Sequence, residues 1–79
     1  DPDTIAQIET IAANYPAVMG YHDLQTRTAG SRLFINLHIE LDGNQSLHDA
    51  HGISAGLKRA LLDAIPNAQI IIHKDVWQG

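Results

Sequence analysis

The chain has 79 residues, of which 44% are hydrophobic and none is cysteine, and its formal net charge is −4. This length suits one small domain over residues 1–79, and the hydrophobic content is too high for a disordered chain. The lack of cysteine excludes disulfide bonds and zinc fingers with cysteine ligands. The acidic balance and the scattered basic residues argue against nucleic acid as a partner.

The first predicted element is a helix over residues 3–14. The segment Asp1-Pro2-Asp3-Thr4 carries capping side chains and a proline suited to the first turn. Apolar residues then recur at helical spacing and form one face: Ile5, Ile8, Ile11, Ala12 and Tyr15. Pro16 ends the helix, because proline disfavours helical backbone at the residue before it.

Two extended segments follow, joined by a turn. Residues 18–28 contain β-branched and aromatic residues without strict alternation, and Ala29-Gly30-Ser31 is a turn signal. From Leu33 to Asp42 apolar and polar residues alternate, which predicts a strand with one buried face and one polar face. His38 lies on the polar face. We therefore expect a hairpin folded about residues 29–31.

A second helix and a third strand complete the chain. Ser46, with an acidic residue three positions later, resembles a capping box, and apolar residues at helical spacing continue to Ala64. Ile65-Pro66-Asn67 ends this helix, and residues 68–74 form the last strand. The order of elements predicts an α+β, ferredoxin-like αββαβ domain whose three-stranded sheet has two helices on one face. The other face would be bare and would carry His38.

His73 and Asp75 form the first candidate metal site. Side chains alternate between the faces of a strand, so both residues point the same way at the end of the last strand. An imidazole nitrogen and a carboxylate oxygen supply half of a zinc-type coordination shell. The alternative is a solvated polar strand end, and we favour the ligand interpretation.

The remaining histidines lie on the hairpin and on the second helix. If the hairpin folds about position 30, His22 lies opposite His38, and two imidazoles from adjacent strands come close on one face. Alone, each would be interpreted as a solvent-exposed histidine. His48 and His51 stand three positions apart on the helix. We expect His48 to face water, whereas His51 is evenly balanced between a ligand and a solvated side chain.

The sequence does not predict an enzyme or a small-molecule substrate. Ser46 and His48 are close in sequence, but no nucleophile elbow and no phosphate-binding glycine loop accompanies them. Glu40 is a conceivable general base for a metal hydrolase. The chain is, however, too small to build an enclosing pocket around such a site.

Four segments of the chain resemble a known family. They are Gly20-Tyr21-His22-Asp23-Leu24-Gln25-Thr26-Arg27-Thr28-Ala29-Gly30, Phe34-Ile35-Asn36-Leu37-His38-Ile39-Glu40-Leu41, Ala50-His51 and Ile71-Ile72-His73-Lys74-Asp75. They are similar to the cytoplasmic C-terminal domain of cation diffusion facilitators, bacterial zinc and iron efflux transporters of the YiiP-like type. The resemblance spans essentially the whole chain. It implies a metallochaperone-like αββαβ fold that forms a homodimer beneath a transmembrane domain, on the cytoplasmic side of the bacterial inner membrane. That transmembrane domain would lie outside this chain.

The resemblance also implies a ligand set and a function. In the family, divalent metal binds near the dimer interface, favours tighter packing of the two protomers and so regulates transport. The positions that match the family's ligands are His22, His38, His51, His73 and Asp75. Asp75 would be able to bridge two ions, and His48 has no counterpart. Nitrogen and oxygen ligands without thiolate suit Zn²⁺ and also accept Fe²⁺, Ni²⁺, Co²⁺ or Cd²⁺.

The expected function is therefore that of a cytoplasmic regulatory domain in a divalent-cation efflux transporter. Two other functions stay open from the sequence. A freestanding ferredoxin-like interaction module would dimerise without metal, and its histidines would be incidental. A soluble metal chaperone would hand ions to a partner protein.

Overall fold

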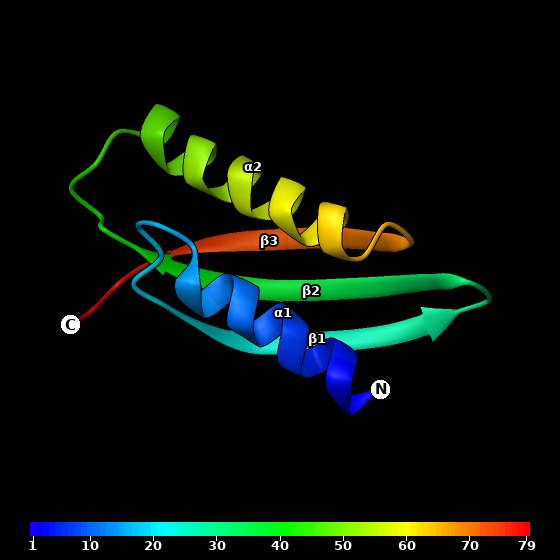
Figure 1. The fold of residues 1–79 in the computed structure, drawn as a ribbon. Helices are drawn as coiled ribbons and strands as arrows, with labels where there is room; N and C mark the ends of the chain where they lie inside the picture. Colours follow the sequence, from blue (N-terminus) through cyan, green and yellow to red (C-terminus); the bar gives the residue numbers. More distant parts are fainter.

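The computed structural model describes residues 1–79 and contains two helices and one three-stranded sheet (Figure 1). The elements are α1 (Pro2–Asn14), β1 (Gly20–Ala29), β2 (Arg32–Leu41), α2 (Leu47–Ala64) and β3 (Ala68–Val76). The strand order is β1-β2-β3, with β1 antiparallel and β3 parallel to β2. Figure 1 shows both helices on one face of the sheet, α1 beside β1 and α2 beside β3. The predicted αββαβ arrangement is confirmed.

Both helices begin at the side chains that the sequence marked as caps. The Asp1 carboxylate accepts a hydrogen bond of 2.9 Å from the backbone N–H of Asp3, and the Ser46 hydroxyl accepts one of 3.0 Å from the backbone N–H of Asp49. Each bond satisfies an N–H group that the helix itself leaves without a partner. Neither helix combines the length and the hydropathy needed to cross a membrane.

The hydrophobic core lies between the helices and one face of the sheet. Alternate residues of β2 are buried and point toward the helices, as the sequence pattern predicted. The buried apolar residues are Ile8, Ala12, Ile35, Leu37, Ile39, Leu41, Leu57, Leu61, Ile65, Ala68 and Ile70. The opposite face of the sheet carries no helix and is called the bare face below. His38 lies on this bare face, between the buried Leu37 and Ile39.

A hydrogen bond between α1 and β1 fixes the helix against the sheet. The Tyr21 hydroxyl donates to the Glu9 carboxylate over 3.1 Å. Burial, the hydrogen bond to Glu9 and the charge of Glu9 together raise the pKa of Tyr21 above its usual value. Tyr21 is therefore held on the helix-covered face, and its neighbour His22 points to the bare face.

A β-bulge in β1 sets the direction of His22. Gln25 pairs with Asn36 on β2, whereas His22 pairs with His38. The two β1 residues between these pairs therefore face a single β2 residue, which defines a bulge. One of them, Asp23, has a φ of +51°, in the left-handed region that Asp tolerates better than most residues. On a regular strand His22 and Gln25, three positions apart, would point to opposite faces, and the bulge brings both to the bare face.

Candidate metal centre

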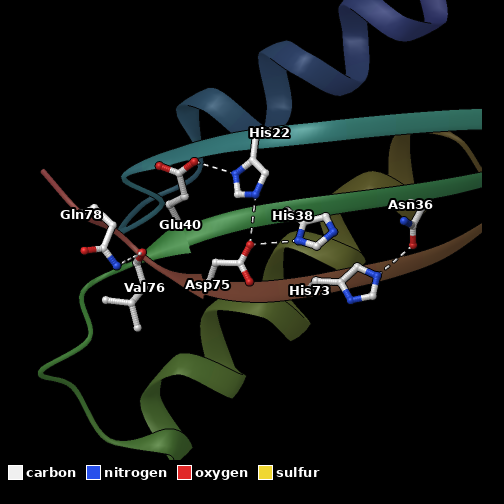
Figure 2. A network of polar contacts seen from close by, with 8 residues as sticks. All are labelled: His22, Asn36, His38, Glu40, His73, Asp75, Val76 and Gln78. Atoms are coloured by element: carbon white, nitrogen blue, oxygen red, sulfur yellow. Dashed lines mark hydrogen bonds and ion pairs between the residues drawn. The ribbon is translucent and has the colours of Figure 1, made fainter.

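Three potential metal ligands converge on the bare face where β1 begins and where β2 and β3 end. Figure 2 shows His22 on β1, His38 on β2 and Asp75 on β3 with their side chains pointing toward one another. One ligand atom from each residue lies within 4.8 Å of the others. The parallel pairing of β2 with β3 and the hairpin register bring these three strand ends together.

The Asp75 carboxylate lies between the two imidazole rings. Its Oδ2 atom is 2.9 Å from Nδ1 of His38 and 3.1 Å from Nε2 of His22. The two rings stack with their centroids 5.0 Å apart. Two imidazole nitrogens and one carboxylate oxygen are the mixed donor set that zinc accepts in proteins, so the chemistry of the group fits a divalent transition metal.

Glu40 holds the second ring nitrogen of His22. Its Oε2 atom lies 2.6 Å from Nδ1 of His22, so both nitrogens of this ring face carboxylate oxygens. The hydrogen bond to Glu40 is the main cause that raises the pKa of His22 above its ordinary value of 6.5, against the opposing effect of desolvation. The negative charges of Glu40, Asp23 and Asp75 add to the increase. His22 therefore holds a proton more strongly than a free histidine.

Asp75 is shifted in the opposite direction. Its hydrogen bond with His38 is the main cause that lowers its pKa below the ordinary value of 3.8, against the opposing effect of desolvation. The charges of His38, His22 and His73 lower the pKa further. Asp75 therefore remains ionised in the pH range in which histidines lose their protons and become metal ligands.

His73 lies beside His22, His38 and Asp75 but is not one of these three converging residues. Its ring stacks on that of His38, with centroids 4.4 Å apart and an angle of 16° between the planes. Its Nε2 atom is 3.0 Å from the Asn36 side-chain oxygen, which accepts a hydrogen bond from the N–H group at that position. Nδ1 is thereby the ring nitrogen left with a free lone pair.

The two helical histidines lie away from the group. Both His51 and His48 are exposed on α2, in the helical layer on the other side of the sheet. The structure of the single chain therefore brings His22, His38, His73 and Asp75 together and does not bring His51 to them. His48 faces water, as its position in the sequence predicts.

Sequence reasoning missed two polar residues that orient the histidines. From the sequence Glu40 is a conceivable general base and Asn36 only a neighbour of His38 on the same face. In the structure Glu40 is bonded to His22 and Asn36 to His73. The alternation along β2 places both on the bare face, and that signal was available. The cross-strand contacts depend on the register of all three strands, which the sequence does not fix.

The chain matches the family described as cation efflux protein, cytoplasmic domain, over residues 1–76. The cation-efflux pump FieF of Shewanella oneidensis is 47% identical to it over 78 residues. This match covers 99% of the chain and 26% of that pump, so the chain spans about a quarter of the length of this relative.

Solved structures of relatives have the same fold. A structure of the zinc transporter CzrB has a TM-score of 0.91 and 30% identity, covering 98% of this chain and 96% of the solved one. The metal-bound C-terminal domain of the CzcD transporter from Thermotoga maritima has a TM-score of 0.90 and 25% identity, covering 99% of this chain and 92% of the solved one. Both solved chains consist almost wholly of this domain, so in these relatives it folds by itself. The resemblance to cation diffusion facilitators is confirmed, and the chain belongs to the cation efflux protein family as its cytoplasmic domain.

Proposed function

We propose that this domain binds a divalent cation on its bare sheet face and thereby regulates a cation efflux transporter. The observation that carries the proposal is the convergence of His22, His38 and Asp75 from three strands to within 4.8 Å. The relatives support it, since one is named a cation-efflux pump, one a zinc transporter and one a metal-bound domain. These names describe transport and metal binding, and the proposal assigns no catalytic role.

Zinc is the proposed ion. His22 would bind through Nε2, His38 through Nδ1 and Asp75 through Oδ2, the three atoms that already face one another. Zinc prefers four ligands, and imidazole together with carboxylate suits it without thiolate. One structure of CzrB is a Zn form. Fe²⁺, Ni²⁺, Co²⁺ and Cd²⁺ are acceptable to the same atoms and are competitors in the test below.

The further ligands proposed are His73 and His51. His73 stacks on His38 and keeps Nδ1 free, so this nitrogen is available to a second ion beside the first. His51 is exposed on the helical layer. Its participation therefore requires a movement of the chain or a second protomer.

A second copy of this chain and the transmembrane part of the same transporter are the proposed partners. The bare face has an exposed apolar residue, Ile71, with 57% of its surface accessible, and a groove of about 480 Å³ whose lining includes Arg27, Phe34 and Ile71. A homodimer that covers this face would bury apolar surface and close the metal site from water. Metal then controls the packing only if it binds one arrangement of the protomers more tightly than the other. The domain would act at the cytoplasmic side of the bacterial inner membrane.

The test is a calorimetric Zn²⁺ titration of the chain, with analytical ultracentrifugation before and after saturation. Alanine variants of His22, His38 and Asp75 should each lose at least about tenfold in affinity, because each removes a ligand. His48→Ala is the matched control and should bind like the native chain, whereas His51→Ala and His73→Ala report whether those residues are ligands. If the native chain binds Zn²⁺ and its sedimentation as a dimer does not change, the proposed regulation by metal is contradicted. No saturable binding would contradict the metal site and favour an interaction module.

A further inference from the structure

Glu40 lies outside the group of three ligands and touches one of its rings. Figure 2 shows its carboxylate reaching across from β2 to His22 on β1, with Oε2 at 2.6 Å from Nδ1. The Glu40 side chain is 26% exposed, so its position is partly fixed by neighbouring atoms. The opposite ring nitrogen, Nε2, points to Asp75. Glu40 and Asp75 therefore hold the two ends of one imidazole ring.

This arrangement selects one form of the His22 ring. A neutral imidazole carries a single proton, and a ring that binds metal through Nε2 must carry that proton on Nδ1. Glu40 accepts a hydrogen bond from this N–H and favours that tautomer over the other. It also restrains rotation of the ring, which keeps the Nε2 lone pair directed at the position between Asp75 and His38.

Gly20 provides the space that the Glu40 carboxylate occupies. Gly20 and Glu40 are direct partners in the β1–β2 pairing. A Cβ atom on residue 20 would lie 2.9 Å from Oε1 of Glu40 and 3.4 Å from its Cδ. Any side chain larger than hydrogen at position 20 would displace the carboxylate. The backbone there is already fixed, because the N–H of Met19 donates to the carbonyl of Glu40 over 2.9 Å.

We propose that Glu40 is a positioning residue that sets the tautomer and orientation of the His22 ligand, and that Gly20 makes room for it. This inference rests on the proposed function, since it requires a metal ion at His22. Glu40 would act through His22 and would not itself bind the ion. Carboxylates that orient metal-binding histidines in this way typically contribute about 10–100-fold in affinity.

The experiment compares three variants that separate charge from hydrogen bonding. Glu40→Ala removes both the charge and the acceptor, whereas Glu40→Gln removes the charge and keeps an acceptor oxygen. Asp23→Asn is the matched control, because it removes a charge beside His22 at a backbone position that Asn also tolerates. Zn²⁺ affinity is measured by competition with a chelator. The protonated nitrogen of His22 is identified by long-range ¹⁵N NMR in the zinc-bound state.

We expect Glu40→Ala to lose about 10–100-fold in Zn²⁺ affinity, and Glu40→Gln to recover most of that loss. Asp23→Asn should resemble Glu40→Gln. In the native protein and in Glu40→Gln, the proton should reside on Nδ1 of His22 and zinc on Nε2. In Glu40→Ala the slowly exchanging Nδ1–H signal should disappear. Gly20→Ala should weaken binding in the same direction as Glu40→Ala, because the displaced carboxylate no longer meets the ring.

Three results would overturn the inference. If Glu40→Gln loses as much affinity as Glu40→Ala, an acceptor oxygen does not position the ring, and Glu40 acts through its charge or as a ligand. If Glu40→Ala loses no more than Asp23→Asn, only its charge matters. If zinc is found on Nδ1 of His22, the tautomer is the opposite one. By contrast, a native chain that binds no Zn²⁺ would refute the proposed function itself, so the two failures are distinguishable.

Discussion

His22 and His38 are direct partners across β1 and β2, with ring centroids 5.0 Å apart. A regular pairing of the strands continued from the turn would instead place these two side chains on different faces of the sheet. At the turn Ala29 pairs with Arg32, and a regular ladder from that pair would place His22 opposite the buried Ile39. The bulge at Asp23 adds one residue to β1 and restores the pairing. The bulge therefore positions a residue of the candidate metal centre as well as shaping the sheet.

The bulge should be sensitive to the residue at position 23. Asp23 has a φ of +51°, a conformation that a β-branched residue adopts only with strain of about 1–2 kcal/mol. Asp23→Val should lower the free energy of unfolding by about this amount. It should also weaken Zn²⁺ binding, because His22 loses its fixed direction. Chemical denaturation with Asp23→Asn as the reference measures the first effect, and an Asp23→Val chain as stable as the reference would refute the explanation.

Zinc affinity should fall on acidification, beginning at a higher pH than for a free histidine. The pKa of His22 is raised above 6.5, chiefly by the hydrogen bond to Glu40, so protons compete for the ring already above that pH. The pKa of Asp75 is lowered below 3.8, so this carboxylate stays ionised throughout the transition. Calorimetric titrations between pH 5.5 and 8.5 measure the dependence. Glu40→Gln should shift the transition to lower pH, and an unchanged midpoint would contradict the assignment to His22.

The metal-free domain should show the opposite dependence. A raised pKa in the folded state means that His22 contributes stability below its ordinary pKa of 6.5, and this contribution is lost as the pH rises through the raised value. A lowered pKa means that Asp75 contributes stability above 3.8, and this is lost as the pH falls through the lowered value. The melting temperature, measured in the presence of a chelator, should therefore be highest between pH 3.8 and pH 6.5, where both contributions are present. A melting temperature that keeps rising above pH 7 without metal would be inconsistent with the His22 pairs.

Two glycines of α2 should respond oppositely to alanine. A Cβ on Gly56 would overlap the Tyr15 hydroxyl oxygen, whereas a Cβ on Gly52 meets nothing within 4 Å. Alanine is favoured over glycine in a helix by about 1 kcal/mol, so Gly52→Ala should stabilise the domain. Gly56→Ala should destabilise it by about 1–3 kcal/mol, because Tyr15 must move.

Equilibrium unfolding of the two variants tests this contrast, since both make the same chemical change in one helix. Tyr15→Phe removes the atom nearest to the added methyl group. Combined with Gly56→Ala, it should recover part of the lost stability. If Gly56→Ala stabilised the domain as much as Gly52→Ala, the close packing of Tyr15 against α2 would be refuted.

The sequence predicted the fold because its local patterns agree with one another. The strict alternation along β2 identified the buried face, and the capping residues Asp1 and Ser46 identified the helix starts. The bounds differ slightly: α1 begins at Pro2, β1 covers Gly20–Ala29 and β3 extends to Val76. The last strand is longer than predicted because its end pairs with β2, where Leu41 is the partner of Val76, and such pairing is a property of the sheet.

The site was predicted less completely than the fold. The pairing of His22 with His38 was predicted from a hairpin centred at position 30, and it is confirmed. The reason for the pairing differs from the predicted one. Near the turn, the β1–β2 register is displaced by one residue from a hairpin centred at position 30, and the bulge compensates for this displacement. The sequence grouped His73 with Asp75 along one strand, whereas the structure places Asp75 closest to His22 and His38 on the other strands. Contacts between strands depend on register and on side-chain rotamers, which no local pattern contains.

The most direct test of the central claim is a crystal structure of the chain grown with Zn²⁺, with anomalous data collected above and below the zinc absorption edge. Our account predicts a zinc peak about 2.0–2.2 Å from Nε2 of His22, Nδ1 of His38 and an oxygen of Asp75. Crystals of Asp75→Asn grown in the same way should show a much weaker peak there. The absence of zinc at this position, or zinc density there that is unaffected by Asp75→Asn, would contradict the account.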